Sequence, residues 1–208
     1  MGGVVIRVVI VDDHPVLRAG VAAVLASYED IDVVGTTGSP VSVTRLVQDA
    51  APDVVLLDLG LGQRDGGELI PDLVGSTRVL VFTASGTDLA ITRALAAGAT
   101  GYLLKDASSD ELAAAVRSVA VGTAVFSHAV AGRMLDRVQR PDETLTPREG
   151  EVLELLGAGL TNRAIAERLY LSESTVKTHL VRVFAKLGVD GRAAAVAEAT
   201  RRGVIELT

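Results

Sequence analysis

Three acidic residues directly follow two apolar segments in the first half of this chain of 208 residues. Asp12 and Asp13 come after Val4–Val11, and Asp58 comes after Val54–Leu57. The carboxyl ends of parallel strands meet at one edge of a sheet, where ligands bind. Crowded carboxylates repel one another unless a cation joins them, and hard oxygen ligands suit Mg²⁺. We therefore expect one acidic pocket that binds magnesium.

A hydroxyl and an ammonium group follow two further apolar segments. Thr83 comes after Val79–Phe82 and Lys105 after Gly101–Leu104, so both would face the same pocket. Such a set could accept a phosphoryl group, with Asp58 as the nucleophile, Mg²⁺ and Lys105 as balancing charges, and Thr83 as a hydrogen-bond donor. Singly, each residue has an ordinary explanation as a turn former, a helix cap or a solvated lysine. Their joint placement carries the prediction.

Short apolar segments alternate with amphipathic ones over residues 1–121. Runs of β-branched and aliphatic residues predict strands that are buried on both faces, as in a parallel sheet. Helix start signals lie between them, such as Pro15, Ser39-Pro40 and the capping box from Ser108 to Glu111. We predict an α/β, flavodoxin-like, doubly wound parallel sheet of five strands. The predicted strands are Val4–Val11, Ile31–Gly35, Val54–Leu57, Val79–Phe82 and Gly101–Leu104.

The last third of the chain has no strand pattern. Thr146-Pro147 combines a helix cap with a proline suited to a first turn, Thr161 and Ser172 can cap two further helices, and Gly188 can end the second of these. A fourth helix follows, and four short helices with tight turns resemble a helix-turn-helix domain. Pro141 and its polar neighbours indicate a linker. We predict an α/β domain over 1–121, a linker with a short helix over 122–143, and an all-α domain over 144–208.

Composition excludes several kinds of site. The chain has no Cys and only three His, far apart, which argues against disulfides, thiolate chemistry and Cys- or His-based metal clusters. Every apolar stretch is shorter than the ~18 residues of a membrane span, and no signal peptide is visible, so we expect a cytoplasmic protein with no membrane partner. Residues 1–127 carry 8 basic and 15 acidic side chains, whereas residues 128–208 carry 12 and 11. This asymmetry suggests two modules with different partners.

The predicted helix Glu173–Lys186 has two different faces. An apolar stripe at helical spacing predicts that one face is buried. The other face is basic and hydroxyl-rich, and after a tight turn it could enter a major groove, with Lys177 near a base edge. A solvated helix face would also explain this pattern. We expect the following residues to contact DNA, the last five of them at phosphates: Ser174, Lys177, Thr178, Val181, Arg182, Asn162, Arg163, Thr175, His179 and Lys186.

Four stretches resemble the receiver domain of bacterial response regulators, most closely in the NarL/FixJ family. They are Val11–Pro15, Leu56–Leu59, Phe82–Ser85 and Gly98–Asp106. The resemblance covers residues 5–121 and implies that Asp58 is phosphorylated, while Thr83 and Tyr102 match the pair that rearranges on phosphorylation. The magnesium ligands that it implies are Asp13, Asp58 and the backbone carbonyl of Gly60, with Asp12 assisting through water.

One stretch departs from the family pattern. Family members usually carry Met-Pro three and four residues after the phosphorylated Asp, where this chain has Leu61-Gly62, while Asp65-Gly66 keeps the register. We expect Gly60–Gly67 to be looser than usual, because it holds four Gly and lacks the Pro, and we expect an altered phosphorylation lifetime rather than lost chemistry. A phosphatase of the haloacid dehalogenase type is excluded, because it needs a second Asp where this chain has Gly60.

Four stretches of residues 144–206 resemble the LuxR-type DNA-binding domain. They are Leu145–Leu153, Gly159–Ala166, Ser174–Leu180 and Lys186–Val189. The resemblance implies that Glu173–Lys186 is the recognition helix and that Ala193–Arg202 is a dimer face. Gly150 stands where the motif commonly has Arg, and Val181 where some relatives have a basic residue. We expect the second departure to lower the affinity for DNA or alter the base choice, and neither departure to abolish the module.

Together the two resemblances identify the chain as a member of the NarL/FixJ-type response regulators of two-component systems, which are transcription regulators and not enzymes. They imply a cognate histidine kinase as partner, Mg²⁺ as cofactor, and promoter DNA bound by a homodimer. Two alternatives stay open. One is a phosphorylation-independent regulator whose receiver serves dimerisation or ligand sensing, and the other is a phosphoryl-transfer relay with an accessory helical domain.

Overall fold

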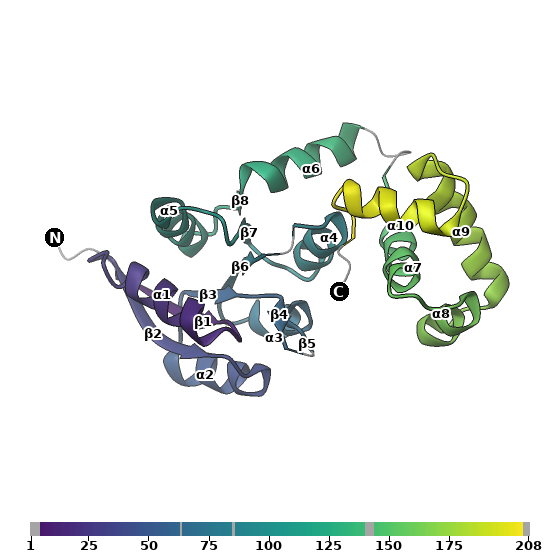
Figure 1. Ribbon diagram of the computed structural model, residues 1–208. Helices are drawn as coiled ribbons and strands as arrows, with labels where there is room; N and C mark the ends of the chain where they lie inside the picture. Colours follow the sequence, from purple (N-terminus) through teal and green to yellow (C-terminus); the bar gives the residue numbers. More distant parts are fainter. Residues whose placement is uncertain (1–4, 63, 85, 140–143, 206–208) are drawn as a thin grey trace. The chain divides into compact units, whose positions relative to one another are not determined.

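A parallel sheet of six strands forms the centre of the first half of the chain (Figure 1). The computed structural model describes residues 5–62, 64–84, 86–139 and 144–205. All five predicted strands are present, and the predicted doubly wound α/β architecture is confirmed. In spatial order the strands are β2 (Ile31–Thr37), β1 (Ile6–Val11), β3 (Val54–Leu57), β6 (Arg78–Thr83), β7 (Gly101–Leu104) and β8 (Val125–Phe126).

Helices cover the sheet. On one face, Val8 and Ile10 of β1 pack in a single cluster with Leu25 and Val116, which belong to two of these helices. The alternate residues of the same strand, such as Val9, are equally buried, so continuous apolar runs are required here. The helices of this half are α1 (Pro15–Leu25), α2 (Val43–Ala50), α3 (Ile70–Leu73), α4 (Asp88–Ala96) and α5 (Ser109–Ala120), with 3₁₀ turns η1 (Pro40–Ser42) and η2 (Gly66–Leu69).

The sixth strand, β8, corrects the prediction of five strands. It lies in the stretch predicted as linker, and it pairs in parallel with β7, with Val125 opposite Gly101 and Phe126 opposite Tyr102. Gly122 follows α5 with a φ of 84°, which reverses the chain toward the sheet. Two residues are too few for periodicity to distinguish a strand from a loop. The short helix that was predicted in the linker is α6 (His128–Gln139).

The stretch that departs from the family pattern forms a small hairpin. Strands β4 (Gly60–Leu61) and β5 (Arg64–Asp65) pair antiparallel, and the Gly66 N–H donates a hydrogen bond of 2.7 Å to the carbonyl of Leu59. A Cβ at Gly66 would lie 2.2 Å from the carbonyl oxygen of Asp58, so only glycine fits there. The described residues of Gly60–Gly67 therefore form a hydrogen-bonded structure, and the expectation that this stretch is looser than usual remains a prediction. Gln63 lies outside the described residues.

The second half is all-α, as predicted. Its helices α7 (Pro147–Gly157), α8 (Asn162–Leu169), α9 (Glu173–Leu187) and α10 (Arg192–Arg201) enclose one apolar cluster. Hydroxyl caps begin the first three, and Gly188 ends α9 with a φ of 69°.

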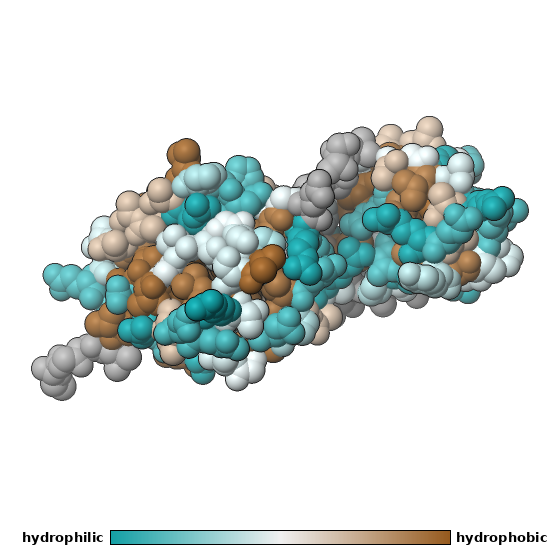
Figure 2. Space-filling view, turned by 90° about the horizontal axis from the view of Figure 1, so that it is seen from below, coloured by the Kyte–Doolittle hydropathy of each residue, from teal (hydrophilic) through white to brown (hydrophobic). Residues whose placement is uncertain are grey.

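By their contacts, the residues form two compact units, 1–85 with 93–130 and 86–92 with 131–208. The predicted boundaries at residues 121 and 144 remain predictions. No helix within the described ranges is long and apolar enough to cross a membrane. Hydrophilic residues cover much of the face seen in Figure 2, and the hydrophobic ones lie in separate patches.

Candidate functional site

Backbone hydrogen bonds align the strand ends that carry the predicted acidic pocket. The N–H of Asp58 donates to the carbonyl of Val11 at 2.9 Å, which places the end of β3 beside the end of β1. The N–H of Lys105 donates to the carbonyl of Thr83 at 2.9 Å, which does the same for β7 and β6. The parallel register therefore brings the four strand ends to one edge of the sheet.

A single ammonium group joins two buried carboxylates in this pocket. Lys105 Nζ lies 2.6 Å from Asp58 Oδ2 and 2.8 Å from Asp12 Oδ2. The Asp12 and Asp58 side chains are only 5% and 4% exposed. Desolvation lowers the pKa of Lys105, but the hydrogen bonds and charges of the two carboxylates outweigh it, so that this pKa is raised. Lys105 is therefore a firmly held positive charge opposite Asp58.

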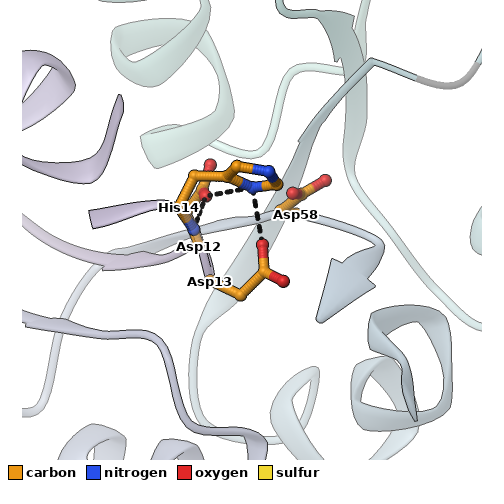
Figure 3. A group of neighbouring side chains, drawn as sticks. All are labelled: Asp12, Asp13, His14 and Asp58. Carbon is orange, nitrogen blue, oxygen red and sulfur yellow. Dashed lines mark hydrogen bonds and ion pairs between the residues drawn. The ribbon is translucent and has the colours of Figure 1, made fainter. Parts of the chain in front are cut away.

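Four side chains could hold a metal ion at this edge. Asp12, Asp13, His14 and Asp58 each offer one ligand atom, and these atoms lie within 4.8 Å of one another. Figure 3 shows the ring of His14 beside the carboxylate of Asp13, and its Nδ1 lies 2.7 Å from Asp13 Oδ1. That buried oxygen nevertheless accepts no hydrogen bond from the described residues. Three of these four side chains are carboxylates, and carboxylate oxygens are ligands that suit Mg²⁺.

His14 was not among the predicted site residues. It directly follows Asp13 and its N–H donates to Asp12 Oδ1 at 2.8 Å, so the start of α1 brings its ring to the carboxylates. Its place in the Asp-Asp-His run was the only signal available. The predicted ligand Gly60 does lie at the pocket, where its N–H donates to Asp58 Oδ1 at 3.2 Å.

The two predicted switch residues, Thr83 and Tyr102, are buried. Thr83 ends β6 and is 3% exposed, while Tyr102 lies in the neighbouring strand β7 and is fully buried. An ordinary edge aromatic would keep part of its ring in water, so the tyrosine here is held inside the unit.

The predicted DNA-contacting face of α9 is exposed to solvent. Its apolar stripe, including Val176 and Leu180, is buried, while Lys177, Thr178 and Arg182 are exposed. Val181 is 67% exposed, which leaves a large apolar side chain on the same face. Of the remaining predicted contacts, Asn162 and Arg163 begin α8, Ser174 and Thr175 lie in the first turn of α9, and His179 is half-buried.

Lys186 differs from the other predicted DNA contacts because its ammonium group lies in an ion pair within the protein. Its Nζ lies 2.7 Å from Glu149 Oε2 and donates to the carbonyl of Thr144 at 2.8 Å. Glu149 is 2% exposed. Burial raises the pKa of Glu149, but Lys186 and the N–H of Thr146 outweigh this effect and lower it. Lys186 therefore ties α9 to the start of α7.

Comparison with known families agrees with this geometry. The response regulator receiver domain family matches residues 8–117, which include the whole acidic pocket. The luxR family of bacterial regulatory proteins matches residues 143–199, which include α7 to α9.

Individual proteins match over nearly the whole chain. DevR/DosR of Mycobacterium tuberculosis, a DNA-binding transcriptional activator, is 38% identical over 94% of both chains. The transcriptional regulatory protein LiaR of Bacillus subtilis is 35% identical over 96% of this chain and 99% of that protein. In the crystal structure of ChrA, a response regulator of a heme-sensing two-component system, identity is 41% and the TM-score 0.54, over 97% of this chain and 100% of that one.

RcsB of Salmonella typhimurium is 25% identical with a TM-score of 0.62, over 95% of this chain and 99% of that one. The chain therefore belongs to the two-component response regulators that combine a receiver domain with a LuxR-type DNA-binding domain, and it is a transcription regulator rather than an enzyme.

Proposed function

We propose that this response regulator is switched by phosphorylation of Asp58 and that its phosphorylated form binds promoter DNA as a homodimer. A cognate histidine kinase supplies the phosphoryl group, and phosphorylation and DNA binding both take place in the cytoplasm. The observation that carries the proposal is the pocket itself, in which one lysine ammonium contacts Asp58 at 2.6 Å and Asp12 at 2.8 Å.

The reaction proposed for the pocket is a single displacement at phosphorus. A carboxylate oxygen of Asp58 attacks the phosphorus of a phosphohistidine, the O–P bond forms as the P–N bond breaks, and the leaving imidazole takes up a proton. Lys105 faces the charge that collects on the phosphoryl oxygens. When bound, Mg²⁺ supplies further positive charge there, and the residues that would hold it are Asp13, Asp58 and the carbonyl of Gly60, with Asp12 through water.

The switch couples this pocket to the neighbouring strands. Thr83 is the last residue of β6 and lies beside Lys105. Its hydroxyl is suited to donate a hydrogen bond to the phosphoryl group. Tyr102 is fully buried in the neighbouring strand β7, so a movement of Thr83 changes the space available to its ring. A buried pair of this kind has discrete packings, and the added charge favours one of them.

The DNA-binding face is the exposed side of α9. Lys177 and Arg182 supply positive charge, Thr178 a hydroxyl, and Val181 an apolar surface that suits a thymine methyl group. Asn162 and Arg163 at the start of α8 are suited to phosphate oxygens, which position a protein without reading sequence.

Intact-mass spectrometry tests the phosphorylation step. The wild type, Asp58→Asn and Asp65→Asn are incubated with Mg²⁺ and a small phosphodonor such as acetyl phosphate. One phosphoryl group should appear on the wild type and on Asp65→Asn, a variant of an exposed carboxylate in the adjacent hairpin, and none on Asp58→Asn. Uptake by Asp58→Asn would defeat the assignment. A folded wild type that takes up no phosphate from this donor or from its kinase would favour the phosphorylation-independent alternative.

Selection of binding sites from random DNA duplexes, with phosphorylated wild type and with Asp58→Asn, tests the second step. The phosphorylated protein should enrich a two-fold repeated site, because a dimer places two recognition helices on two half-sites. Equal enrichment by both proteins would show that phosphorylation does not control binding. A failure to enrich any sequence would favour the relay alternative.

A further inference from the structure

The hairpin β4–β5 contacts the acidic pocket through one backbone group. The Gly62 N–H donates a hydrogen bond of 2.9 Å to Asp13 Oδ2. The other oxygen of this carboxylate, Oδ1, is buried, lies 2.7 Å from Nδ1 of His14 and accepts no hydrogen bond from the described residues. Asp13 offers one carboxylate oxygen to the candidate metal cluster. Oδ2 of Asp13 is thus bonded to the hairpin, which leaves Oδ1 for the pocket.

We propose that Gly62 is a positioning residue for the divalent metal ion of this receiver. Its N–H fixes Oδ2 of Asp13, and Oδ1 is thereby directed at the other metal ligands. The inference rests on the proposed function, because it concerns the Mg²⁺ that supports phosphorylation of Asp58. Gly62 itself touches neither the metal nor the phosphoryl group and acts only through Asp13.

The donor exists because the chain departs from its family pattern at this position. A proline, the usual residue here, has no N–H and could not make the bond. Gly62 also has a φ of 65°, a left-handed conformation that proline cannot adopt. Glycine in place of the usual Pro therefore allows a hydrogen bond that orients a metal ligand.

The rest of the hairpin holds this donor in place. Leu61, which precedes Gly62, is 3% exposed, so its side chain anchors the strand in the core. On the far side, Arg64 pairs with Leu61 and Asp65 with Gly60, and Asp65 Oδ1 accepts the N–H of Gly67 at 2.8 Å. A hydrogen bond from a fixed backbone group orients a carboxylate at little entropic cost, which is the usual role of partners of metal ligands.

Two substitutions test the role of Gly62, one that keeps its N–H and one that removes it. Gly62→Asn keeps the N–H, tolerates a positive φ, and has room for its side chain because nothing lies within 4 Å of the added Cβ. Gly62→Pro removes the N–H. In calorimetric titrations of the full-length protein with Mg²⁺, Gly62→Asn should bind within about threefold of the wild type. Gly62→Pro should bind about tenfold to a hundredfold more weakly.

A second measurement avoids the change of backbone shape that proline brings. In ¹⁵N NMR spectra of the wild type, the Gly62 amide should be protected from hydrogen exchange, and Asp13→Ala should remove this protection. The amide of Gly67, which donates to Asp65 in the same hairpin, is the internal control and should keep its protection. Its parallel loss would mean that the hairpin had unfolded and would overturn the proposed specific link.

The outcomes distinguish this inference from the proposed function. Equal Mg²⁺ affinity of Gly62→Pro and the wild type, equal losses in Gly62→Pro and Gly62→Asn, or an unprotected Gly62 amide would overturn the positioning role. Phosphorylation of the wild type at Asp58 could still be intact in each case. Conversely, the expected affinities and protection without any phosphorylation would uphold the positioning role while the proposed function failed. A wild type without affinity for Mg²⁺ would overturn both.

Discussion

Replacement of Lys186 by Met should destabilise the DNA-binding unit without removing a contact to DNA. The ammonium holds Glu149, whose side chain is 3% exposed, at 2.7 Å, and its own side chain is 18% exposed. Removing one partner of a buried ion pair costs about 3–5 kcal/mol, and water can reach this lysine, so we expect the low end, about 3 kcal/mol. For a small domain this lowers the melting temperature by roughly 12–24 °C.

The loss should depend on the carboxylate that is left behind. Glu149→Gln leaves the ammonium without its charged partner and should also destabilise, whereas the double variant Glu149→Gln/Lys186→Met leaves no buried charge. The double variant should therefore be more stable than the sum of the single effects predicts, by about 1–3 kcal/mol. Thermal unfolding of the full-length protein, followed by far-UV circular dichroism, measures all four proteins of this cycle.

DNA binding supplies the discriminating test. Each phosphate contact adds about 0.9 to the slope of log affinity against log salt concentration. At a temperature where each variant is folded, Lys186→Met should keep the wild-type slope. A variant of the exposed Lys177, Lys177→Met, should have a smaller slope if that lysine binds phosphate, or relaxed base preference if it binds a base. A Lys186→Met variant that melts like the wild type and whose slope falls by about one would refute the structural role of Lys186.

Three further predictions concern the pocket, the hairpin and acid stability. Lys105→Met leaves two nearly buried carboxylates without their cation, so the receiver should melt at lower temperature in EDTA and recover markedly in Mg²⁺; equal losses in both media would contradict the role of charge. Gly66→Ala should abolish phosphorylation or destabilise the receiver, since the new Cβ would clash with the carbonyl of Asp58, whereas Gly75→Ala, with open space around it, should do neither. Because the pKa of Glu149 is lowered in the folded state, the unfolded chain binds more protons. The contribution of Glu149 to stability is therefore complete above its unfolded pKa and is lost as pH falls through its folded pKa. Melting curves should therefore shift less between pH 7 and about pH 4 for Glu149→Gln/Lys186→Met than for the wild type, and equal shifts would count against this ion pair.

The sequence was sufficient to predict the acidic pocket, because the carboxyl ends of parallel strands lie at one edge of a sheet. Residues that follow β1, β3, β6 and β7 must then meet, whatever the details of packing, and the placement of Asp12, Asp58 and Lys105 needed no other information. The same rule does not extend to groups supplied by loops. The contribution of Gly62 comes from its N–H, which a residue pattern does not display, and the exposed ring of His14 reaches Asp13 through the local start of α1.

The ion pair of Lys186 and the strand β8 were not predicted from the sequence, for different physical reasons. On a helical projection, Lys186 belongs to a basic face, and its partner Glu149 lies 37 residues earlier in the chain, so only tertiary packing reveals the ion pair. Glu149 itself was visible only as the acidic residue of a capping box. The strand β8 has two residues, and its pairing depends on β7 offering a free edge rather than on its own propensity.

The pairing of β8 also has a consequence for handling this protein. The backbone of β7 is bonded on both sides, and the N–H of Ser127 donates to the carbonyl of Tyr102 at 3.2 Å. A receiver truncated at residue 121 would lose these partners and expose β7 as a bare edge, the kind of strand that recruits other chains into aggregates. Two residues, Val125 and Phe126, thus act as a cap against self-association, and an isolated receiver should extend to residue 130 to remain soluble.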